Sequence, residues 1–273
     1  IADDSRVDGI VNPGNPIKKI MKFSATILGS GTSQGVPVIA CECRVCTSDK
    51  PEDNRLRCSV LLEIAGKNYV IDAGPDFRQQ MLANHENTVD IALLTHEHND
   101  HVIGLDDMRP LIFKSGNDMP LYCYSRVGNE VKKRFPYAFA DERYPGAPAF
   151  DLHEIENTPF SVLGTEITPI EVIHFKITVF GYKFKNLAYI TDAGFISDTE
   201  KEKLKNLDVL ILNCIRKFDP HPAHFILPDV IRLFEELKPK KLFLTHISHH
   251  LGLHDVEDKQ LPSGMHLAYD GLE

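Results

Sequence analysis

The sequence lacks a long apolar run, an excess of basic residues and the cysteine pattern of a secreted scaffold. No stretch of about 18 or more apolar residues occurs, so no membrane partner is expected, and residues 1–20 lack the apolar segment of a signal peptide. The formal net charge of -9 at pH 7 makes nucleic acid an unlikely main partner, because binding its phosphates requires basic patches. With only six cysteines, three of them within 41–46, a reducing cytoplasmic location is the expectation.

The length of 273 residues fits one large α/β domain or two small ones. Met21 resembles a natural start, because the stretch MKFSATIL opens the first predicted strand. The preceding residues 1–20 are rich in Asp, Asn, Pro and Gly and are predicted to be a loosely ordered extension. Residues 21–273 are therefore predicted to form a single domain.

Strands alternate with helices along the chain, which predicts an α/β fold with helices packed on sheet faces. The segment 197–207 is typical of a helix whose Ser197 and Glu200 form a capping box. The segment 228–238 also predicts a helix, with Pro228 in its first turn. Apolar runs predict buried strands at 23–28, 68–72, 90–95, 187–191, 208–213 and 241–245.

Two short motifs recur in the same order. VIDAG (70–74) precedes LTH (94–96), and ITDAG (190–194) precedes LTH (244–246). The repetition predicts two structurally similar halves, each of which delivers an Asp and a His from strand ends. Because ligand sites in open α/β sheets collect at the carboxyl ends of strands, the two halves are expected to pool these side chains at one edge.

The segment HEHNDH (96–101) places four metal-ligand side chains within six residues, directly after a predicted strand. Imidazole and carboxylate groups are the ligands expected for borderline divalent metals. His96 and His98 can face one ion while Asp100 and His101 turn toward a second. A lone histidine is usually an ordinary surface or core residue, but that explanation does not suit the whole cluster. The cluster therefore predicts a metal site.

The pattern H-x-H-x-D-H after an apolar strand resembles the signature of the metallo-β-lactamase-fold hydrolases, over most of the chain from Met21 onward. The resemblance implies an αββα sandwich of two mixed sheets flanked by helices, with two pseudo-symmetric halves. It also implies two divalent ions, Mn or Zn. Its implied ligands are His96, His98 and His174 for the first ion, Asp100, His101 and His246 for the second, and Asp192 between them. Asp72 is expected either to orient a ligand or to cap a turn.

The segment CECRVC predicts a second kind of metal site. Cys41, Cys43 and Cys46 in a cytosolic chain favour a metal knuckle over a disulfide. Tetrahedral zinc needs a fourth ligand, which His249 can supply, with His250 as the weaker candidate. Four protein ligands close such a site, so the role predicted for this zinc is structural.

The knuckle and the glycine-rich opening GSGTSQGVP (29–37) together resemble one branch of the superfamily, that of the phosphoribosyl 1,2-cyclic phosphate phosphodiesterase of phosphonate (C–P lyase) degradation. The resemblance implies hydrolysis of a small, anionic phosphate ester, including cyclic ones, by a hydroxide that two metal ions activate. The expected catalytic residues are Asp100, which is also a metal ligand, and His224, as a phosphate contact or general acid. His221 is a neighbouring candidate, and a loop histidine is the alternative for both.

Other functions remain open at this point. The fold also hosts RNA-processing endonucleases, thioester and lactam hydrolases, and a non-catalytic binding protein of pyrroloquinoline quinone biosynthesis. All seven ligand positions are filled here, which favours catalysis. Asp106, Asp107 and Arg109 are expected to have a structural role rather than to contact substrate. The connection 134–150 is rich in aromatics and prolines and is expected to shape specificity or a homodimer contact.

Overall fold

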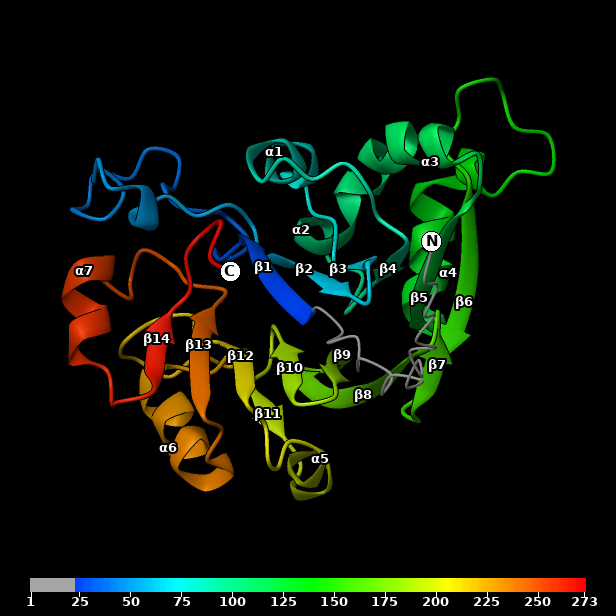
Figure 1. The fold of residues 1–273 in the computed structure, drawn as a ribbon. Helices are drawn as coiled ribbons and strands as arrows, with labels where there is room; N and C mark the ends of the chain where they lie inside the picture. Colours follow the sequence, from blue (N-terminus) through cyan, green and yellow to red (C-terminus); the bar gives the residue numbers. More distant parts are fainter. Residues whose placement is uncertain (1–22) are drawn as a thin grey trace, which may run out of the picture.

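The computed structural model describes residues 23–273, so the predicted extension 1–20 and the proposed start at Met21 lie outside the described residues. Two mixed sheets face each other, and helices cover their outer sides (Figure 1). This is the αββα sandwich that the resemblance implied. No helix in residues 23–273 combines the length and apolarity needed to cross a bilayer.

The first sheet is built only from residues 23–155. The first three strands pair antiparallel and the remaining ones parallel, because the chain passes from hairpins to helical crossovers after the third strand. The spatial order follows the chain: β1 (Phe23–Gly29), β2 (Ser59–Ile64), β3 (Lys67–Ile71), β4 (Ile91–Leu93), β5 (Met119–Tyr124) and β6 (Phe150–Ile155).

The second sheet is built from residues 160–267 and repeats this plan. Its strands lie in the order β11 (Phe195–Ile196), β8 (Thr165–His174), β9 (Ile177–Phe184), β10 (Leu187–Ile190), β12 (Val209–Asn213), β13 (Lys241–Thr245) and β14 (Met265–Leu267), while β7 (Phe160–Val162) pairs with β8. Strands β8, β9 and β10 pair antiparallel, and β10, β12, β13 and β14 pair parallel.

The two halves are therefore alike, as the repeated motifs predicted, but the correspondence holds only in part. The two Asp-Ala-Gly motifs are equivalent, since Asp72 follows β3 and Asp192 follows β10. The two Leu-Thr-His motifs are not equivalent. His96 follows β4, the parallel neighbour of β3, whereas His246 follows β13, which is separated from β10 by β12. Two matching strings had suggested a full repeat, and strand order corrects this.

Helices cover both outer faces, and three apolar layers result (Figure 1). Leu28, Val70 and Phe77 belong to the layer between the first sheet and its helices, whereas Tyr69 and Tyr182 belong to the layer between the sheets. The α-helices are α1 (Phe77–Ala83), α2 (Asn99–Val102), α3 (Arg109–Ser115), α4 (Ser125–Arg134), α5 (Asp198–Lys203), α6 (Leu227–Leu237) and α7 (His254–Glu257). Short 3-10 helices span Pro51–Asp53, Ile103–Met108, Pro136–Ala138 and Asp258–Gln260.

All six predicted strands and both predicted helices exist, but helix α5 is shorter than the segment 197–207. Its predicted capping box is only half formed. The Ser197 hydroxyl accepts from the Glu200 N–H, as a cap should. The Glu200 carboxylate instead accepts from the N–H of Glu171 and from Asn157. The side chain therefore ties α5 to β8 rather than closing the cap.

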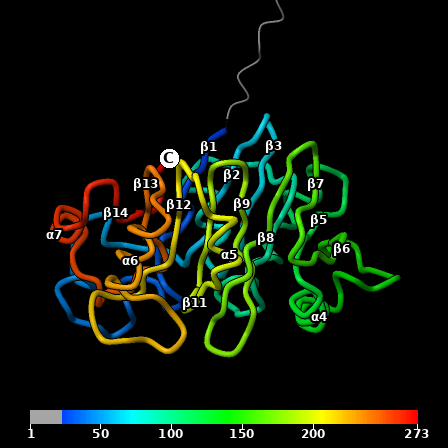
Figure 2. Tube along the Cα trace, turned by 90° about the horizontal axis from the view of Figure 1, so that it is seen from below, coloured from blue at the N-terminus to red at the C-terminus, as the bar shows by residue number. Residues whose placement is uncertain are grey.

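The carboxyl end of the chain lies beside β1 in both views (Figures 1 and 2). The N–H of Ile27 donates to the carbonyl of Leu272, and the N–H of Gly271 donates back to Ile27. Asp270 accepts from the N–H groups of Ser30 and Leu56. This pairing fixes the start of the glycine-rich loop that follows β1.

Candidate metal centre

The candidate residues come together at the carboxyl ends of β3, β4, β10 and β13. The backbone turns sharply at this edge, since Asp72, Asp192 and His246 all have positive φ values, of 63, 56 and 54°. Asn, Asp and His are the residues other than Gly that occupy this left-handed region most often. These turns direct the three side chains toward the edge where the two sheets meet.

The first group consists of His96, His98 and His174, whose ligand atoms lie within 4.8 Å of one another. His96 Nε2 and His98 Nδ1 are 2.9 Å apart. His174, at the end of β8, donates from Nδ1 to the carbonyl of Ala223 at 3.0 Å. That bond leaves Nε2 of His174 as the nitrogen that can bind a metal ion. The second half of the chain thus completes a group begun by the first.

The second group contains His101, Asp192 and His246, again within 4.8 Å of one another. Asp192 Oδ2 lies 3.2 Å from His101 Nε2 and 3.2 Å from His246 Nδ1. An oxygen of Asp100 is also 3.2 Å from His101 Nε2. All seven predicted ligands therefore lie in two adjacent groups.

Asp72 is completely buried and holds His101 from behind. Its carboxylate accepts from His101 Nδ1 at 2.7 Å, and from the N–H and hydroxyl of Thr95 at 2.8 Å each. These contacts fix the tautomer that leaves Nε2 of His101 facing the second group. The geometry favours the orienting role over a simple turn cap.

Burial keeps most imidazoles of the centre neutral. Removal from water lowers the pKa of His96, His98 and His246, and the charge of neighbouring imidazoles lowers it further. Neutral imidazole is the form that binds a metal ion. These side chains are thus ready to act as ligands without losing a proton first.

The carboxylates of Asp100 and Asp192 make the centre favourable for positive charge. Burial alone would raise the pKa of Asp100 and Asp192, but His101 and His246 offset it and lower both. Burial would lower the pKa of His101, yet Asp192, Asp72 and Asp100 raise it well above its usual value. Although buried, Nε2 of His101 makes no hydrogen bond among the described residues. A ring nitrogen in this position, between two ionised carboxylates, fits coordination to a divalent cation.

His224 lies against the centre, and His221 lies behind it. The His224 ring is 4.6 Å from the ring of His174 and 4.9 Å from that of His246, and its Nδ1 is 3.8 Å from Asp192. Burial and the neighbouring imidazoles lower the pKa of His224 to about 2. The ring of His221 is 4.8 Å from His224. Of these two histidines, only His224 borders the metal-ligand groups directly.

Cys58 is a member of the second group that the sequence patterns did not indicate. Its Sγ lies 3.2 Å from His246 Nδ1 and 3.3 Å from the Thr191 hydroxyl, and burial raises the pKa of the thiol to about 12. The residue lies just before β2, more than forty residues from His101 in the chain. No local spacing connects it with the metal-ligand motifs, so only the fold reveals it.

The cysteine knuckle forms a separate group. His249 Nδ1 lies 3.2, 3.4 and 3.3 Å from the sulfurs of Cys41, Cys43 and Cys46. Hydrogen bonding from the backbone of Cys46 lowers the pKa of Cys43 to about 6. Three thiols and one imidazole form a closed donor set for tetrahedral zinc. The structure places His249 here and leaves His250 outside the group.

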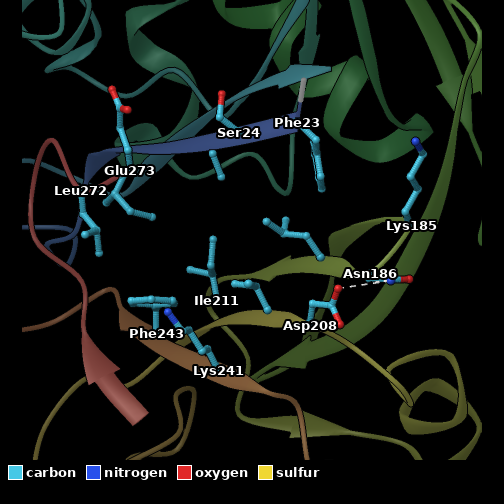
Figure 3. A pocket seen from close by; sticks show the side chains of 14 residues that line it. Phe23, Ser24, Lys185, Asn186, Asp208, Ile211, Lys241, Phe243, Leu272 and Glu273 are labelled. Atoms are coloured by element: carbon cyan, nitrogen blue, oxygen red, sulfur yellow. Dashed lines mark hydrogen bonds between the residues drawn. The ribbon is translucent and has the colours of Figure 1, made fainter. Parts of the chain in front are cut away.

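Two pockets lie at different distances from the metal-ligand groups. One, of about 220 Å³, is lined by residues of the glycine-rich loop, of the segment after β12 and of the segment after β13. A larger one, of about 460 Å³, lies between the sheets beside Phe23, Lys185 and Phe243 (Figure 3). Phe23 and Lys185 lie at the amino ends of β1 and β10, and Lys241, the first residue of β13, also lines this pocket. The larger pocket is therefore remote from the metal-ligand groups.

Two other predicted segments have structural contacts. Asp106 accepts from Arg109 and, at 2.7 Å, from the hydroxyl of Tyr137. The connection 134–150 thus packs against the segment that follows the metal-ligand loop, and Phe135 and Ala138 are buried in the core. These contacts fit the structural role expected for Asp106 and Arg109, whereas Asp107 makes none of them. A homodimer contact through 134–150 stays a prediction.

Both the sequence and the fold of the chain are similar to those of known proteins. A family model described as the β-lactamase superfamily domain matches residues 67–247. The chain belongs to the metallo-β-lactamase superfamily. A crystal structure described as a new diphosphatase from the PhnP family superposes on this superfamily member with a TM-score of 0.85, at 40% identity, covering 92% of this chain and 96% of the other. This places the chain in the PhnP-like branch.

Curated relatives of this superfamily member carry different names. A protein named octanoyltransferase, from Porphyromonas gingivalis, is 39% identical over 249 residues, covering 90% of this chain and 50% of the relative. The chain thus spans about half the length of that protein. Coenzyme PQQ synthesis protein B of Methylobacterium radiotolerans is 32% identical over 218 residues, covering 68% of this chain and 71% of the relative.

Proposed function

We propose that the protein is a metal-dependent phosphodiesterase that hydrolyses a small anionic phosphate ester. The observation that carries the proposal is the meeting of the seven predicted His and Asp ligands in two adjacent groups, with His224 beside both. A similar protein of known structure, described as a diphosphatase, supports phosphate-ester chemistry. We also propose that the ligand groups hold two divalent ions, Mn or Zn, and that the cysteine knuckle holds structural zinc.

The proposed chemistry uses the charge balance of the centre. Two divalent cations held there would supply Lewis-acid activation of water and stabilise the charge of a phosphate group. Asp100 and Asp192 offset only part of that positive charge, because the histidine ligands bind neutral. The centre would remain attractive to an anionic ester. Asp72 would keep His101 in the orientation needed to bind a metal ion. Asp192 contacts His101 of the second group and lies within 4.8 Å of His174 of the first, which suits a ligand between the two ions.

His224 is proposed to contact the substrate phosphate. With a pKa of about 2 in the free protein, the imidazole is neutral and can donate one hydrogen bond from its ring N–H. The buried Nδ1 of this ring makes no hydrogen bond to any residue in 23–273. A phosphate bound beside the ring would raise its pKa, because a nearby negative charge favours the imidazolium. The same side chain could then protonate the leaving oxygen.

The alternatives are less well supported. An RNA endonuclease of this fold would need basic surface for the phosphate backbone, and the chain carries a net charge of -9. A purely binding protein would not need every ligand position. The name octanoyltransferase belongs to a protein twice as long as the part matched here, so acyl transfer has no separate support from the site.

The test is hydrolysis of bis(p-nitrophenyl) phosphate, a ribose 1,2-cyclic phosphate and a short RNA, each with added Mn²⁺ or Zn²⁺. His224→Gln should lower kcat for a diester by roughly 10²–10⁴-fold at unchanged metal content, as expected for lost acid catalysis. His153→Gln is the matched control, since His153 pairs with Asp151 on β6, away from the centre. Absence of turnover of every diester would contradict the proposal, and turnover of RNA alone would favour the nuclease.

A further inference from the structure

We propose that the pocket of about 460 Å³, at the edge of the sandwich opposite the metal centre, binds a carboxylic acid with an unbranched aliphatic tail. The tail would occupy the apolar space between the two sheets, and the carboxylate would contact Lys241 at its mouth. The metal centre lies at the carboxyl ends of β10 and β13, whereas this pocket lies at their amino ends. The inference therefore goes beyond the proposed function and does not depend on it.

The space exists because the inner faces of the two sheets are not fully packed at this edge. Its lining comes from inward-facing side chains of both sheets: Phe23, Ala25 and Ile27 of β1, and Leu187, Val209, Ile211 and Phe243 of β10, β12 and β13 (Figure 3). Side chains from both faces must interdigitate to fill the layer of about 10 Å between two sheets. Ala25 contributes only a methyl group, and Phe23, Val209 and Phe243 stay partly exposed. Apolar surface left open to water in this way favours an apolar occupant.

Lys241 occupies an inward-facing position at the mouth of this space. Side chains alternate between the two faces of a strand. Phe243, two residues further on, belongs to the layer between the sheets, whereas Leu242 belongs to the layer under the helices. The register pairs Lys241 with Val209, which pairs in turn with Leu187. Lys241 thus ends a row that is otherwise apolar, and Figure 3 shows it beside Phe243 at the cavity.

The charges around the mouth leave Lys241 available for an anion. It forms no ion pair with any residue in 23–273, whereas its neighbour Lys240 is paired with Asp208 at 2.6 Å. That pair neutralises Asp208, the acidic residue that the second sheet contributes to the lining. Glu273 lies on the opposite side, beside β1, and its carboxylate points away from the cavity (Figure 3). Lys185, which also has no ion pair within the described residues, adds a second positive charge at the mouth.

A slender amphipathic anion fits this combination of size, lining and charge. A volume of about 460 Å³ is within the range of sites for small molecules, which are mostly apolar with a few polar groups that fix orientation. The apolar side chains lie between the sheets rather than on a protruding face, so an aliphatic tail can reach them and a flat protein surface cannot. The stem of a lysine can follow an apolar wall while its amino group stays at the water boundary, where the carboxylate would lie.

The test is titration calorimetry of the full chain with octanoate, decanoate and dodecanoate, at concentrations below micelle formation. Affinity should rise about fourfold for each added methylene until the space is filled, because each buried methylene contributes a similar free energy. Lys241→Gln should weaken decanoate binding about fivefold and leave the binding of uncharged 1-decanol unchanged. Lys132→Gln, which alters an exposed lysine on α4, is the matched control and should change neither affinity.

A second variant and a chelation control identify the place of binding. Ala25→Leu should fill the space and weaken the binding of all three acids at least about tenfold, while urea unfolding shows that the variant is folded. Removal of the metal ions should leave decanoate affinity unchanged, and a loss of binding on chelation would overturn the inference by placing the carboxylate at the metal centre. Affinity independent of tail length, or unchanged decanoate affinity in Lys241→Gln, would overturn it too. So would absence of binding by the full chain, whether the space closes or the residues before Phe23 fill it.

Discussion

Asp72→Asn should weaken metal binding without removing any predicted ligand. The native carboxylate is fully buried and accepts three hydrogen bonds, two from Thr95 and one from His101. The Asn amide has almost the same shape as the carboxylate. Its NH₂ group, however, is itself a donor and would face the donors of Thr95 or His101, so it could not accept their hydrogen bonds. Hydrogen bonds to charged groups contribute roughly 1.5–3 kcal/mol each, so the loss of one or two should lower the free energy of unfolding by about 2–4 kcal/mol. Because His101 would lose its orienting partner, metal affinity should fall roughly 10–100-fold.

The two effects of Asp72→Asn can be measured separately. Urea unfolding of the protein after its metal ions are removed measures the free energy of unfolding. Competition with a chromophoric chelator measures the metal affinity. Asp90→Asn is the matched control, because Asp90 accepts from the N–H of Asn68 and from Lys67 at the surface, far from the centre. It should change metal affinity by less than about twofold. If Asp72→Asn also bound metal within about twofold of wild type, the orienting role of Asp72 would be refuted.

Two further predictions concern the knuckle and acid stability. His249→Ala should release the knuckle metal and lower the free energy of unfolding by several kcal/mol, because metal binding contributes directly to folding. His250→Ala should keep the metal. Elemental analysis measures the metal content of both variants, and urea unfolding measures their stability. Burial lowers the pKa of His96, His224 and His246, so the unfolded chain takes up protons that the folded chain does not. The free energy of unfolding of the metal-free protein should therefore fall by up to about 1.4 kcal/mol per pH unit for each such imidazole as the pH falls below 6.5. His224→Gln should make this fall less steep. A free energy of unfolding that does not change with pH would contradict the prediction.

The sequence was most informative where the chemistry is local. Four of the seven ligands lie within 96–101, so their spacing alone indicated a metal site. His174 could be placed only through the family resemblance, because it stands alone in its segment, whereas the repeated Asp-Ala-Gly motif also pointed to Asp192. The equivalence of the two Leu-Thr-His motifs was wrong, since a three-letter match does not encode strand order. The sequence correctly predicted that two similar halves would meet.

Features that depend on long-range packing could not be read from spacing. Cys58 joins His246 across 188 positions, and only the pairing of the sheets brings them to 3.2 Å. The pocket of about 220 Å³ combines the loop after β1 with segments after β12 and β13. Strands β8 and β9 also escaped prediction. Thr, Glu and Pro interrupt the apolar positions of β8, and Gly181 and Lys183 interrupt those of β9, although only Glu166 among all these residues is exposed. In each case the information lies in contacts between segments far apart in the chain.

The division of the chain into two sheets has a consequence for assembly. Residues 23–155 contribute His96, His98, Asp100 and His101, whereas residues 160–267 contribute His174, Asp192 and His246. Neither part contains all the predicted ligands, so a fragment with only one of the sheets would bind the ions weakly. Cutting the backbone between β6 and β7 should give two fragments that bind each other more tightly in the presence of divalent ions, because each ion would take ligands from both fragments. Loss of metal would then weaken the contact between the two sheets before either sheet unfolds.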